Sequence, residues 1–193
     1  KSFHFYVKED PTRVGGPNLR MIRLDPNKPS LTVTAYIFNK FVHPYENRFI
    51  TPREAARLQG FPDDLEFKGS LGSVQLQVGN AVPLPLGKAV FRTVLEHAKK
   101  IDPQNQTFFA LSLFSGAGGS DIAASNSEIV DARWKTYASI ELDQDCCETL
   151  SGYSNNDSEI INESVYSIPD PVLFSQNLGV KKKDVWLIYG GPP

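Results

Sequence analysis

The chain has 193 residues, of which 40% are hydrophobic and 22% charged, enough apolar material to bury a sizeable core and too much for global disorder. No apolar run approaches the roughly 18 residues that cross a bilayer, and no secretory signal opens the chain, so an intracellular, cytoplasmic protein without membrane contact is expected. The two cysteines, Cys146 and Cys147, are adjacent, which excludes a disulfide scaffold and offers no zinc-binding spacing, so no metal is expected.

The net charge of -2 conceals an asymmetry along the chain. Residues 1–57 contain ten Lys or Arg against five Asp or Glu, and the other residues contain ten against seventeen. A basic N-terminal third is a weak indication of a polyanionic partner such as nucleic acid, because solvated surfaces vary this much by chance. Because the first residue is lysine, the chain is expected to be a processed product or a piece of something longer.

The first 50 residues are predicted to be extended and loop structure, because prolines and glycines interrupt them, with one short strand at Leu31–Ala35. The next segment begins with Thr51 as N-cap, a proline at the first helical position and a glutamate three residues after the cap. These signals predict a helix from Pro52 to about Gln59, and Gly60 suits the left-handed position that ends it.

Another helix is predicted after Pro83, ending near Lys99 and Lys100. Its predicted buried face consists of Leu86, Ala89, Val90, Val94 and Ala98. An apolar strand at 108–114, a glycine-rich turn at 115–119 and a short helix to about Ser125 follow. Further strands are predicted at 136–142, weakly near 163–167, and at 184–189. This alternation indicates a parallel, doubly wound α/β sheet.

The turn Ser115-Gly-Ala-Gly-Gly119 is the first candidate ligand site. It follows a strand of the predicted parallel sheet, where ligands bind, although by itself it is equally compatible with a tight connection. Glu141 closes the next strand, 25 residues beyond Gly116, where a carboxylate can accept hydrogen bonds from both hydroxyls of a ribose. The two features together predict an adenosine cofactor, and they leave open a nicotinamide or flavin dinucleotide and S-adenosylmethionine.

Five segments resemble motifs of the DNA cytosine-5 methyltransferase family. They are FSGAGG (motif I), IELD (II), DVWLIYGGPP (IV), RFITPREAARLQGFPDD (IX) and QVGNAVPLPLGKAV (X). In most of the family motifs IX and X follow motif I, whereas here they precede it. The resemblance implies a circularly permuted class I S-adenosylmethionine-dependent methyltransferase, Rossmann-like and incomplete in this chain. It divides the chain into an extended segment leading out of a DNA-recognition region (1–50), helices with motifs IX and X (51–100) and a cofactor-binding core (107–193).

The resemblance also implies a pocket for S-adenosylmethionine and its product S-adenosylhomocysteine. Its members are Phe114, Ser115, Gly116, Gly118, Gly119, Glu141, Leu142, Ser164, Pro192, Asn80 and Val82. Phe114 would pack on the adenine, Glu141 would bind the ribose and Leu142 would lie beside the adenine. Asn80, with Gly79 and Val82, would reach the methionine end. Phe114 could instead be ordinary core, and Asn80 could bond its own turn.

Two positions depart from the family pattern. Ser164 stands where the family usually offers an aspartate to the adenine amino group, and Glu163 is the alternative, one residue out of register. The GGPP segment is followed in the family by a cysteine whose thiolate attacks C6 of a flipped-out cytosine, whereas this sequence ends at Pro193. Cys146 and Cys147 are predicted not to replace it, because they lie near the adenosine end among acidic residues.

These departures lead to the expectation of a half-enzyme. With the usual strand order 3-2-1-4, the strand at 184–189 would be central in the whole domain, yet its second neighbour is missing. We therefore expect a complementary polypeptide or continuation that carries the nucleophile, the later motifs and most of the recognition domain. The expected function is cofactor binding for cytosine-5 methylation of double-stranded DNA in a restriction–modification setting.

Two other functions remain possible from the sequence. The chain could be a catalytically silent cofactor-binding module that serves a partner as a regulatory or scaffold subunit, or, less consistent with motif X, a dinucleotide oxidoreductase. Basic residues of the N-terminal third could lie near DNA phosphates: Lys28, Lys40, His43 and Arg48. For His43, a turn-stabilising role is the alternative, and Arg53 and Arg57 are predicted to be scaffold or helix-surface charges.

Overall fold

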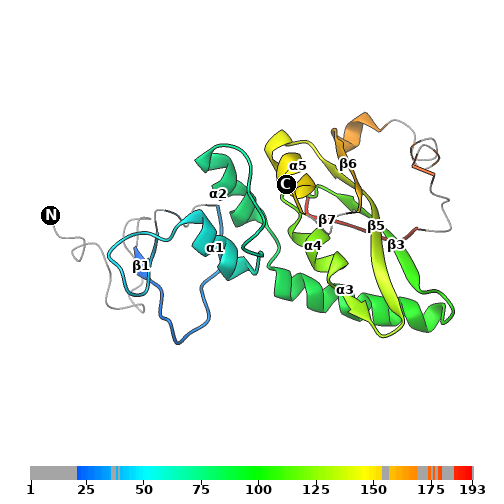
Figure 1. Cartoon of the computed structure of the whole chain (residues 1–193), viewed down its shortest axis with the longest axis horizontal. Coiled ribbons are helices and arrows are strands. Elements are labelled where there is room, and N and C mark those ends of the chain that lie inside the picture. Colours follow the sequence, from blue (N-terminus) through cyan, green and yellow to red (C-terminus); the bar gives the residue numbers. More distant parts are fainter. Residues whose placement is uncertain are drawn as a thin grey trace.

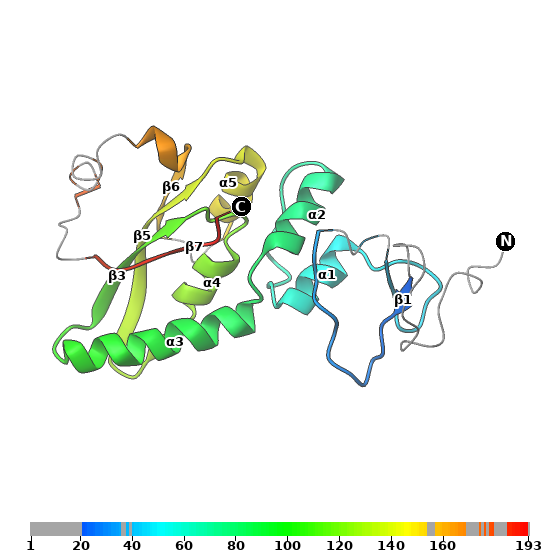
Figure 2. The same cartoon turned by 180° about the vertical axis from the view of Figure 1, so that it is seen from behind.

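A small helical lobe and a larger sheet lobe share the chain (Figures 1 and 2). The computed structural model describes residues 21–35, 38, 40–153, 157–168, 174, 176, 178–179 and 185–192, so the predictions for residues 1–20 and for Pro193 lie outside it. The small lobe contains β1 (Ile22–Arg23), β2 (Phe41–Val42), α1 (Pro52–Gln59) and α2 (Leu71–Asn80). Within these ranges no helix combines the length and apolarity needed to span a membrane.

Helix α1 begins and ends as its capping residues predict. The Thr51 hydroxyl accepts the Glu54 N–H at 3.2 Å, and the Glu54 carboxylate accepts the Thr51 N–H at 2.8 Å. Gly60 has a φ of 85° and donates to the Arg57 carbonyl. Two hydrogen bonds from Arg48 fix Glu54 further and lower its pKa to about 2. The predicted helix is confirmed.

Helix α2 lies in a stretch for which the sequence does not predict a helix. Its N-cap is Ser70, whose hydroxyl accepts the Ser73 N–H at 3.2 Å. Two glycines and a weakly amphipathic pattern give this segment little helical signal in the sequence. Tertiary contacts, rather than helix propensity, hold the helix in place. Gln77 accepts a 2.7 Å hydrogen bond from Thr149, and Gln59 donates to the Val78 carbonyl at 3.1 Å.

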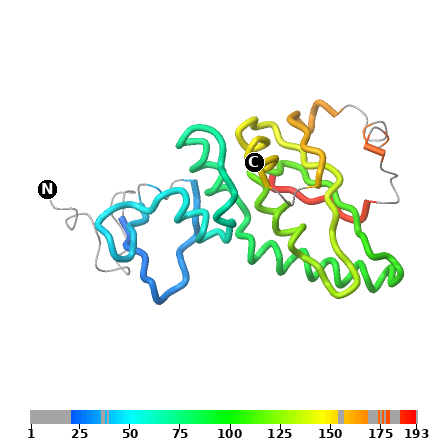
Figure 3. Tube along the Cα trace, viewed as in Figure 1, coloured from blue at the N-terminus to red at the C-terminus, as the bar shows by residue number. Residues whose placement is uncertain are grey.

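Helix α3 (Leu84–Ile101) links the two lobes and runs along the sheet (Figure 3). Of its predicted buried face, Ala98 is buried and the other four residues are not: Leu86 is 59% exposed, Val90 53% and Val94 36%, and Ala89 is exposed as well. The residues that it buries are Leu84, Gly87, Phe91, Leu95 and Ala98. A Cβ at Gly87 would lie 2.8 Å from that of Ala123, so a close crossing with α4 (Gly119–Ser125) determines the buried face.

The main sheet is built from β3 (Thr107–Leu113), β5 (Ala132–Glu141), β6 (Glu159–Asn162) and β7 (Val185–Gly190), all parallel, in the order β6-β5-β3-β7. The short β4 (Glu128–Ile129) pairs with β5 in antiparallel fashion. When the parallel strands β3, β5, β6 and β7 are numbered 1 to 4 in chain order, this order is 3-2-1-4, as predicted from the sequence. The expected parallel α/β fold is confirmed. Asp184, the first residue of the predicted last strand, lies outside the described residues.

Two predicted strands are wrong. The strand expected near 163–167 lies earlier, at Glu159–Asn162, and Val165–Ser167 forms a 3-10 helix capped by the Ser164 hydroxyl. Leu31–Ala35 is not a strand: Val33 is buried in the small lobe, and the backbone at Ala35 packs against Gly79. Alternating residues make a strand only where a neighbour completes the hydrogen-bond ladder.

Helices α3 and α4 cover one face of the sheet. Phe91, Leu95 and Ala98 of α3 join Ala123 and Ala124 of α4 in a buried cluster on the strands. The cluster's strand residues are Phe108, Ala110, Ala132 and Trp134. Trp134 also donates its indole N–H to the Phe91 carbonyl at 2.9 Å. Helix α5 (Gln144–Ser151) follows β5 and buries Cys147, Thr149 and Leu150.

Candidate functional site

The glycine-rich turn between β3 and α4 combines a packed side with an open one. Phe114 and Gly118 both have positive φ, 54° and 83°, so the backbone reverses sharply at the end of β3. A Cβ at Gly118 would approach Leu150 to 2.4 Å, whereas a Cβ at Gly116 would meet nothing within 4 Å. The turn is therefore seated on α5 through Gly118 and leaves space beside Gly116 for a ligand.

Glu141 reaches back from the end of β5 to this turn. One carboxylate oxygen accepts the Gly116 N–H at 2.7 Å, and the other accepts the Leu142 and Asp143 N–H groups at 2.8 and 2.9 Å. A carboxylate has about four acceptor positions, so these N–H groups take three of them and leave one beside the open turn. To bind both hydroxyls of a ribose, Glu141 would have to release one of these three N–H groups.

The segment after α2 covers the start of α4. A Cβ at Gly119 would lie 3.0 Å from the Val82 carbonyl and 3.2 Å from the Ala81 Cβ. Gln59 of α1 donates to the Ala81 carbonyl at 3.2 Å and thereby ties the first helix to this contact. Residues 37 and 38 positions apart in sequence thus meet at the turn. Asn80 ends α2 and is exposed, and Val82 is 38% exposed.

The end of β6 fixes the end of β5. The Asn162 side chain donates to the Glu141 and Leu142 carbonyls at 3.1 and 2.9 Å, an interaction that sequence reasoning missed. Leu142 is 68% exposed, as an apolar side chain facing a ligand would be. Ser164, which follows β6, uses its hydroxyl to accept the Tyr166 N–H at 3.3 Å.

Parallel strands bring their carboxyl ends to one edge of the sheet, so the segments after β3, β5, β6 and β7 lie along the same edge. Phe114 and the turn follow β3, Leu142 follows β5, Ser164 follows β6 and Pro192 follows β7. Direct contacts join the turn to Glu141 and to Val82. For Ser164 and Pro192 the structure gives the shared edge and no direct contact with the turn.

The basic residues of the small lobe are largely engaged in intramolecular contacts. Arg48 donates two hydrogen bonds to Glu54 and one to Glu46, and the Nδ1 of His43 accepts the Tyr45 and Glu46 N–H groups. His43 therefore stabilises a turn. Lys28 pairs with Asp25 across 3.3 Å at the surface.

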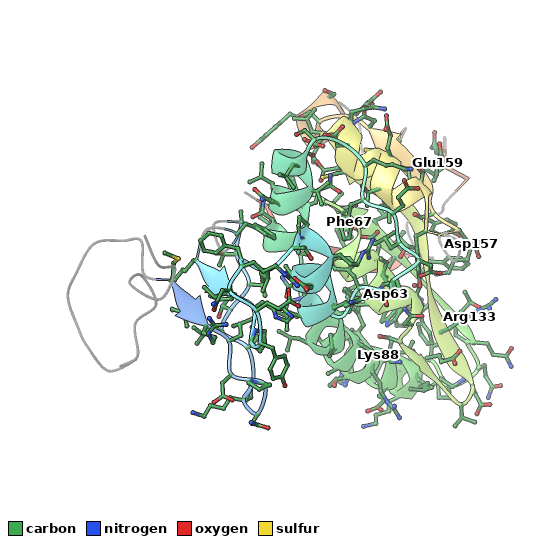
Figure 4. The ribbon with its side chains drawn as sticks, turned by 60° about the vertical axis from the view of Figure 1, so that its left-hand side comes forward. Asp63, Phe67, Lys88, Arg133, Asp157 and Glu159 are labelled. Carbon is green, nitrogen blue, oxygen red and sulfur yellow. The ribbon has the colours of Figure 1, made fainter. Side chains whose placement is uncertain are left out.

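Arg53 and Arg57 serve as scaffold charges, as the sequence predicts. Arg53 donates to the carbonyls of Pro62 and Leu65, and its guanidinium lies 5.5 Å from the centre of the Phe67 ring. Arg57 pairs with Asp63 at 2.7 Å (Asp63 and Phe67 are labelled in Figure 4).

The two cysteines of the chain are poor nucleophiles. Burial, reinforced by the charges of Glu141 and Asp143, raises the pKa of Cys147 to about 11, and burial together with Asp143 raises the pKa of Cys146 still further. Both thiols therefore stay protonated at neutral pH, and only the thiolate attacks. This agrees with the predicted incidental role of the pair.

Sequence reasoning also missed a buried carboxylate beneath the turn. Asp121, in the first turn of α4, is 5% exposed and accepts hydrogen bonds from Ser112, Ser139 and Tyr189 on three adjacent strands. The sequence does contain a signal for it, because an acidic residue stands between a glycine turn and the apolar stretch Ile122–Ala124. An acidic residue buried with such a stretch needs hydrogen-bond partners, since acidic residues are almost never buried without them.

The known proteins that this chain is similar to belong to one class, the DNA methyltransferases. Residues 7–96 match the model of the C-5 cytosine-specific DNA methylase family. The chain is 47% identical over 85 residues to type II methyltransferase M.PspPI of Psychrobacter sp., an alignment covering 40% of this chain and 20% of that protein. Against type II methyltransferase M.AquIB of Picosynechococcus sp. it is 48% identical over 85 residues, covering 38% of this chain and 61% of the relative.

A plant protein gives a similar match. The DNA (cytosine-5)-methyltransferase CMT2 of Oryza sativa subsp. japonica is 41% identical over 71 residues, which cover 36% of this chain and 5% of the relative. The aligned part thus spans less than two thirds of each of these relatives. The family match at 7–96 contains α1, α2 and the greater part of α3, and the sheet lies outside it.

Proposed function

Because residues 7–96 match the model of the C-5 cytosine-specific DNA methylase family, we propose that this chain is the S-adenosylmethionine-binding part of a DNA cytosine-5 methyltransferase. In this proposal its methyl acceptor is C5 of cytosine in double-stranded DNA, within a restriction–modification system. The observation that supports it best is the packing of the family-matched segment onto the glycine turn, where Ala81 and Val82 contact Gly119. The motif order, X before I, is then a circular permutation of the family.

The residues at the sheet edge fit the cofactor chemically. The open side of Gly116 admits a ligand, the remaining acceptor position of Glu141 suits a ribose hydroxyl, and Leu142 offers an exposed apolar surface to adenine. When bound, S-adenosylmethionine supplies the methyl group from a sulfonium. The chain itself contributes orientation: Glu141 and Leu142 hold the nucleoside end, and the Asn80–Val82 segment holds the methionine end.

The cysteine nucleophile is proposed to come from the rest of the enzyme. Cys146 and Cys147 have raised pKa values and lie near the nucleoside end of the proposed site, so neither suits attack on cytosine C6. Within the described residues β7 pairs with β3 on one side and with no strand on the other. A parallel edge strand is a template for a further strand, which we assign to the complementary polypeptide.

The exposed stripe of α3 extends this proposed interface. It consists of Leu86, Ala89, Val90 and Val94. Phe91, on the buried side of the same helix, packs edge-on against Tyr189 of β7 with ring centroids 4.8 Å apart, so the helix that bears the stripe also contacts β7. A strand and its connection added beside β7 would cover apolar side chains that water now reaches.

Substituting Val90 by glutamate tests this assignment. Because Val90 is 53% exposed, Val90→Glu is expected to change the free energy of unfolding by less than about 0.5 kcal/mol. Binding to the complementary polypeptide should weaken by at least about 10-fold, since a charge would be buried without a partner. Arg92→Glu, on the charged side of α3, is the control. Unchanged affinity for Val90→Glu, measured by calorimetry, would remove α3 from the interface.

The function itself is tested by reconstitution. The chain alone is expected to bind S-adenosylhomocysteine, to show no affinity for nicotinamide cofactors and to transfer no methyl groups. Mixed with a polypeptide carrying the nucleophile and the recognition domain, it should transfer tritiated methyl groups from S-adenosylmethionine to cytosine C5. Cofactor binding with no transfer by the assembled complex would favour the catalytically silent module, and absence of S-adenosylhomocysteine binding would contradict the proposal altogether.

A further inference from the structure

One rung of side chains crosses the centre of the sheet just before its strands end. Ser112 of β3 is the register partner of both Ser139 on β5 and Tyr189 on β7. All three side chains point to the face covered by α4, where they converge on the carboxylate of Asp121 at 3.1, 2.6 and 3.3 Å. A single helical residue therefore connects the three neighbouring strands at the same level.

Each hydroxyl of the rung receives a further hydrogen bond. Ser115 donates to Ser112 at 2.8 Å, and Ser158 lies 2.8 Å from Ser139. Thr136 lies 3.0 Å from the Tyr189 hydroxyl. Because Tyr189 and Ser139 each have one proton and donate it to Asp121, Thr136 and Ser158 must act as donors in turn. Three two-step chains of hydroxyls thus end on one acceptor.

The polarity of these chains depends on the ionised state of Asp121. An ionised carboxylate only accepts, so it forces all six hydroxyls to donate inwards, whereas a carboxylic acid or an amide would reverse at least one chain. Burial raises the pKa of Asp121 to about 6, and the hydrogen bonds from Ser139, Ser112 and Tyr189 oppose that rise. Tyr189 is the titratable side chain that contacts Asp121, and its own pKa is raised well above the usual value by burial and by Asp121.

Two of the chains lead into the proposed site. Ser115 belongs to the glycine turn and is 8% exposed, so the Ser115–Ser112–Asp121 chain anchors that turn from below. Tyr189 immediately precedes the Gly190–Pro192 segment, which leads from β7 towards the proposed reaction centre. Gly190 also lies so close to β3 that a Cβ there would be 2.1 Å from the Leu113 carbonyl oxygen, so small shifts of β7 change the contact.

We propose that Asp121 is a positioning residue that sets the spacing between the glycine turn and the Gly190–Pro192 segment through Ser112 and Tyr189. The functional half of this inference rests on the proposed methyltransferase activity. Asp121 touches neither ligand nor reacting atoms in this arrangement. Its carboxylate acts through the hydroxyls that it orients.

The first test needs no cofactor. Hydrogen exchange of the Leu187–Gly190 amides is measured in the chain alone for Asp121→Asn and Tyr189→Phe. Both variants are expected to exchange about 10-fold faster there than the wild type, because β7 loses a tie to α4. The matched control is Tyr153→Phe, which removes a hydroxyl that accepts from Asn126. Tyr153 packs in a second buried cluster, with Phe61, Val78 and Ile122, that contains no residue of β7, so β7 exchange should stay unchanged.

The second test uses the reconstituted enzyme. Tyr189→Phe is expected to keep the dissociation constant for S-adenosylhomocysteine within about 3-fold while kcat for methyl transfer falls roughly 10- to 100-fold, as misplacement by about 1 Å does. If the wild-type complex methylates DNA and Tyr189→Phe matches Tyr153→Phe in kcat, the positioning role is wrong. If the wild-type complex does not methylate but β7 exchange rises as expected, the proposed function fails and the structural role of Asp121 stands. Equal β7 exchange in wild type and variants would overturn the inference.

Discussion

Replacing Glu141 by alanine is expected to lower the affinity of the chain for S-adenosylhomocysteine by at least about 100-fold. Hydrogen bonds to a charged group contribute about 1.5–3 kcal/mol each, and each 1.4 kcal/mol is a factor of ten in affinity. The substitution also removes the acceptor of the Gly116, Leu142 and Asp143 N–H groups, so the turn loses its tie to β5. Isothermal titration of the purified chain measures the change.

Two further variants separate ribose recognition from loss of the hydrogen bond between Glu141 and Gly116. Glu141→Gln keeps the size of the side chain but places an N–H₂ group towards Gly116 or towards Leu142 and Asp143, so its affinity should fall by about 10-fold or more. Glu159→Gln removes a carboxylate from the exposed surface of β6 (Figure 4) and should leave the affinity unchanged. Wild-type affinity in Glu141→Ala would show that the ligand does not contact this carboxylate.

The contact between Glu141 and Gly116 also bears on how the site would open. In the structure the Glu141 carboxylate, at the end of β5, joins the turn that follows β3 by accepting the Gly116 N–H at 2.7 Å. A ribose that binds this carboxylate through both hydroxyls needs two acceptor positions and therefore replaces one of the three N–H groups; if that is the Gly116 N–H, this donor becomes available to the ligand. Since Asn162 holds the neighbouring carbonyls independently, the end of β5 stays in place during this exchange.

Signals confined to a few neighbouring residues predicted structure well. The Thr51–Glu54 capping box and Gly60 located α1, because each cap is completed within one turn of helix. The turn at 115–119 and Glu141 were placed at one edge of the sheet, because parallel strands impose that placement whatever else the fold contains. The strand order 3-2-1-4, taken as the usual one for such a sheet, is also the one observed.

Features that depend on distant partners were mispredicted or missed. The periodicity of apolar residues in α3 is compatible with burial of either of two faces. The close contact of Gly87 with Ala123 determines which face is buried, because only a residue without a side chain fits there. The Asp121 rung needs the register of three strands, which no local pattern contains. Helix α2 depends on Gln59 and Thr149, residues that precede and follow it by many positions.

The small lobe and the proposed site are coupled through α2, which makes a glycine of that helix critical. A Cβ at Gly79 would lie 2.1 Å from the Ala35 nitrogen and 2.4 Å from the Thr34 carbonyl carbon, both backbone atoms that a rotamer change cannot relieve. Either the segment at Thr34–Ala35 or α2 must move. Because Asn80 and Val82 follow directly, movement of α2 would also displace the segment that packs on Gly119.

Gly79→Ala is therefore expected to destabilise the chain by roughly 3 kcal/mol, at the upper end for an overpacked site, and to lower Tm by about 6–12 °C. The matched control is Gly72→Ala in the same helix, where the new Cβ would meet only the Ser70 hydroxyl at 3.9 Å. Alanine there should stabilise by up to about 0.5–1 kcal/mol, because it restricts the unfolded chain without a clash. Thermal unfolding of both variants followed by circular dichroism measures the two changes. Opposite signs would establish that the lobe contact at Gly79, rather than helix propensity, holds α2 in place, whereas two stabilised variants would mean that Thr34 and Ala35 do not pack on this helix in solution.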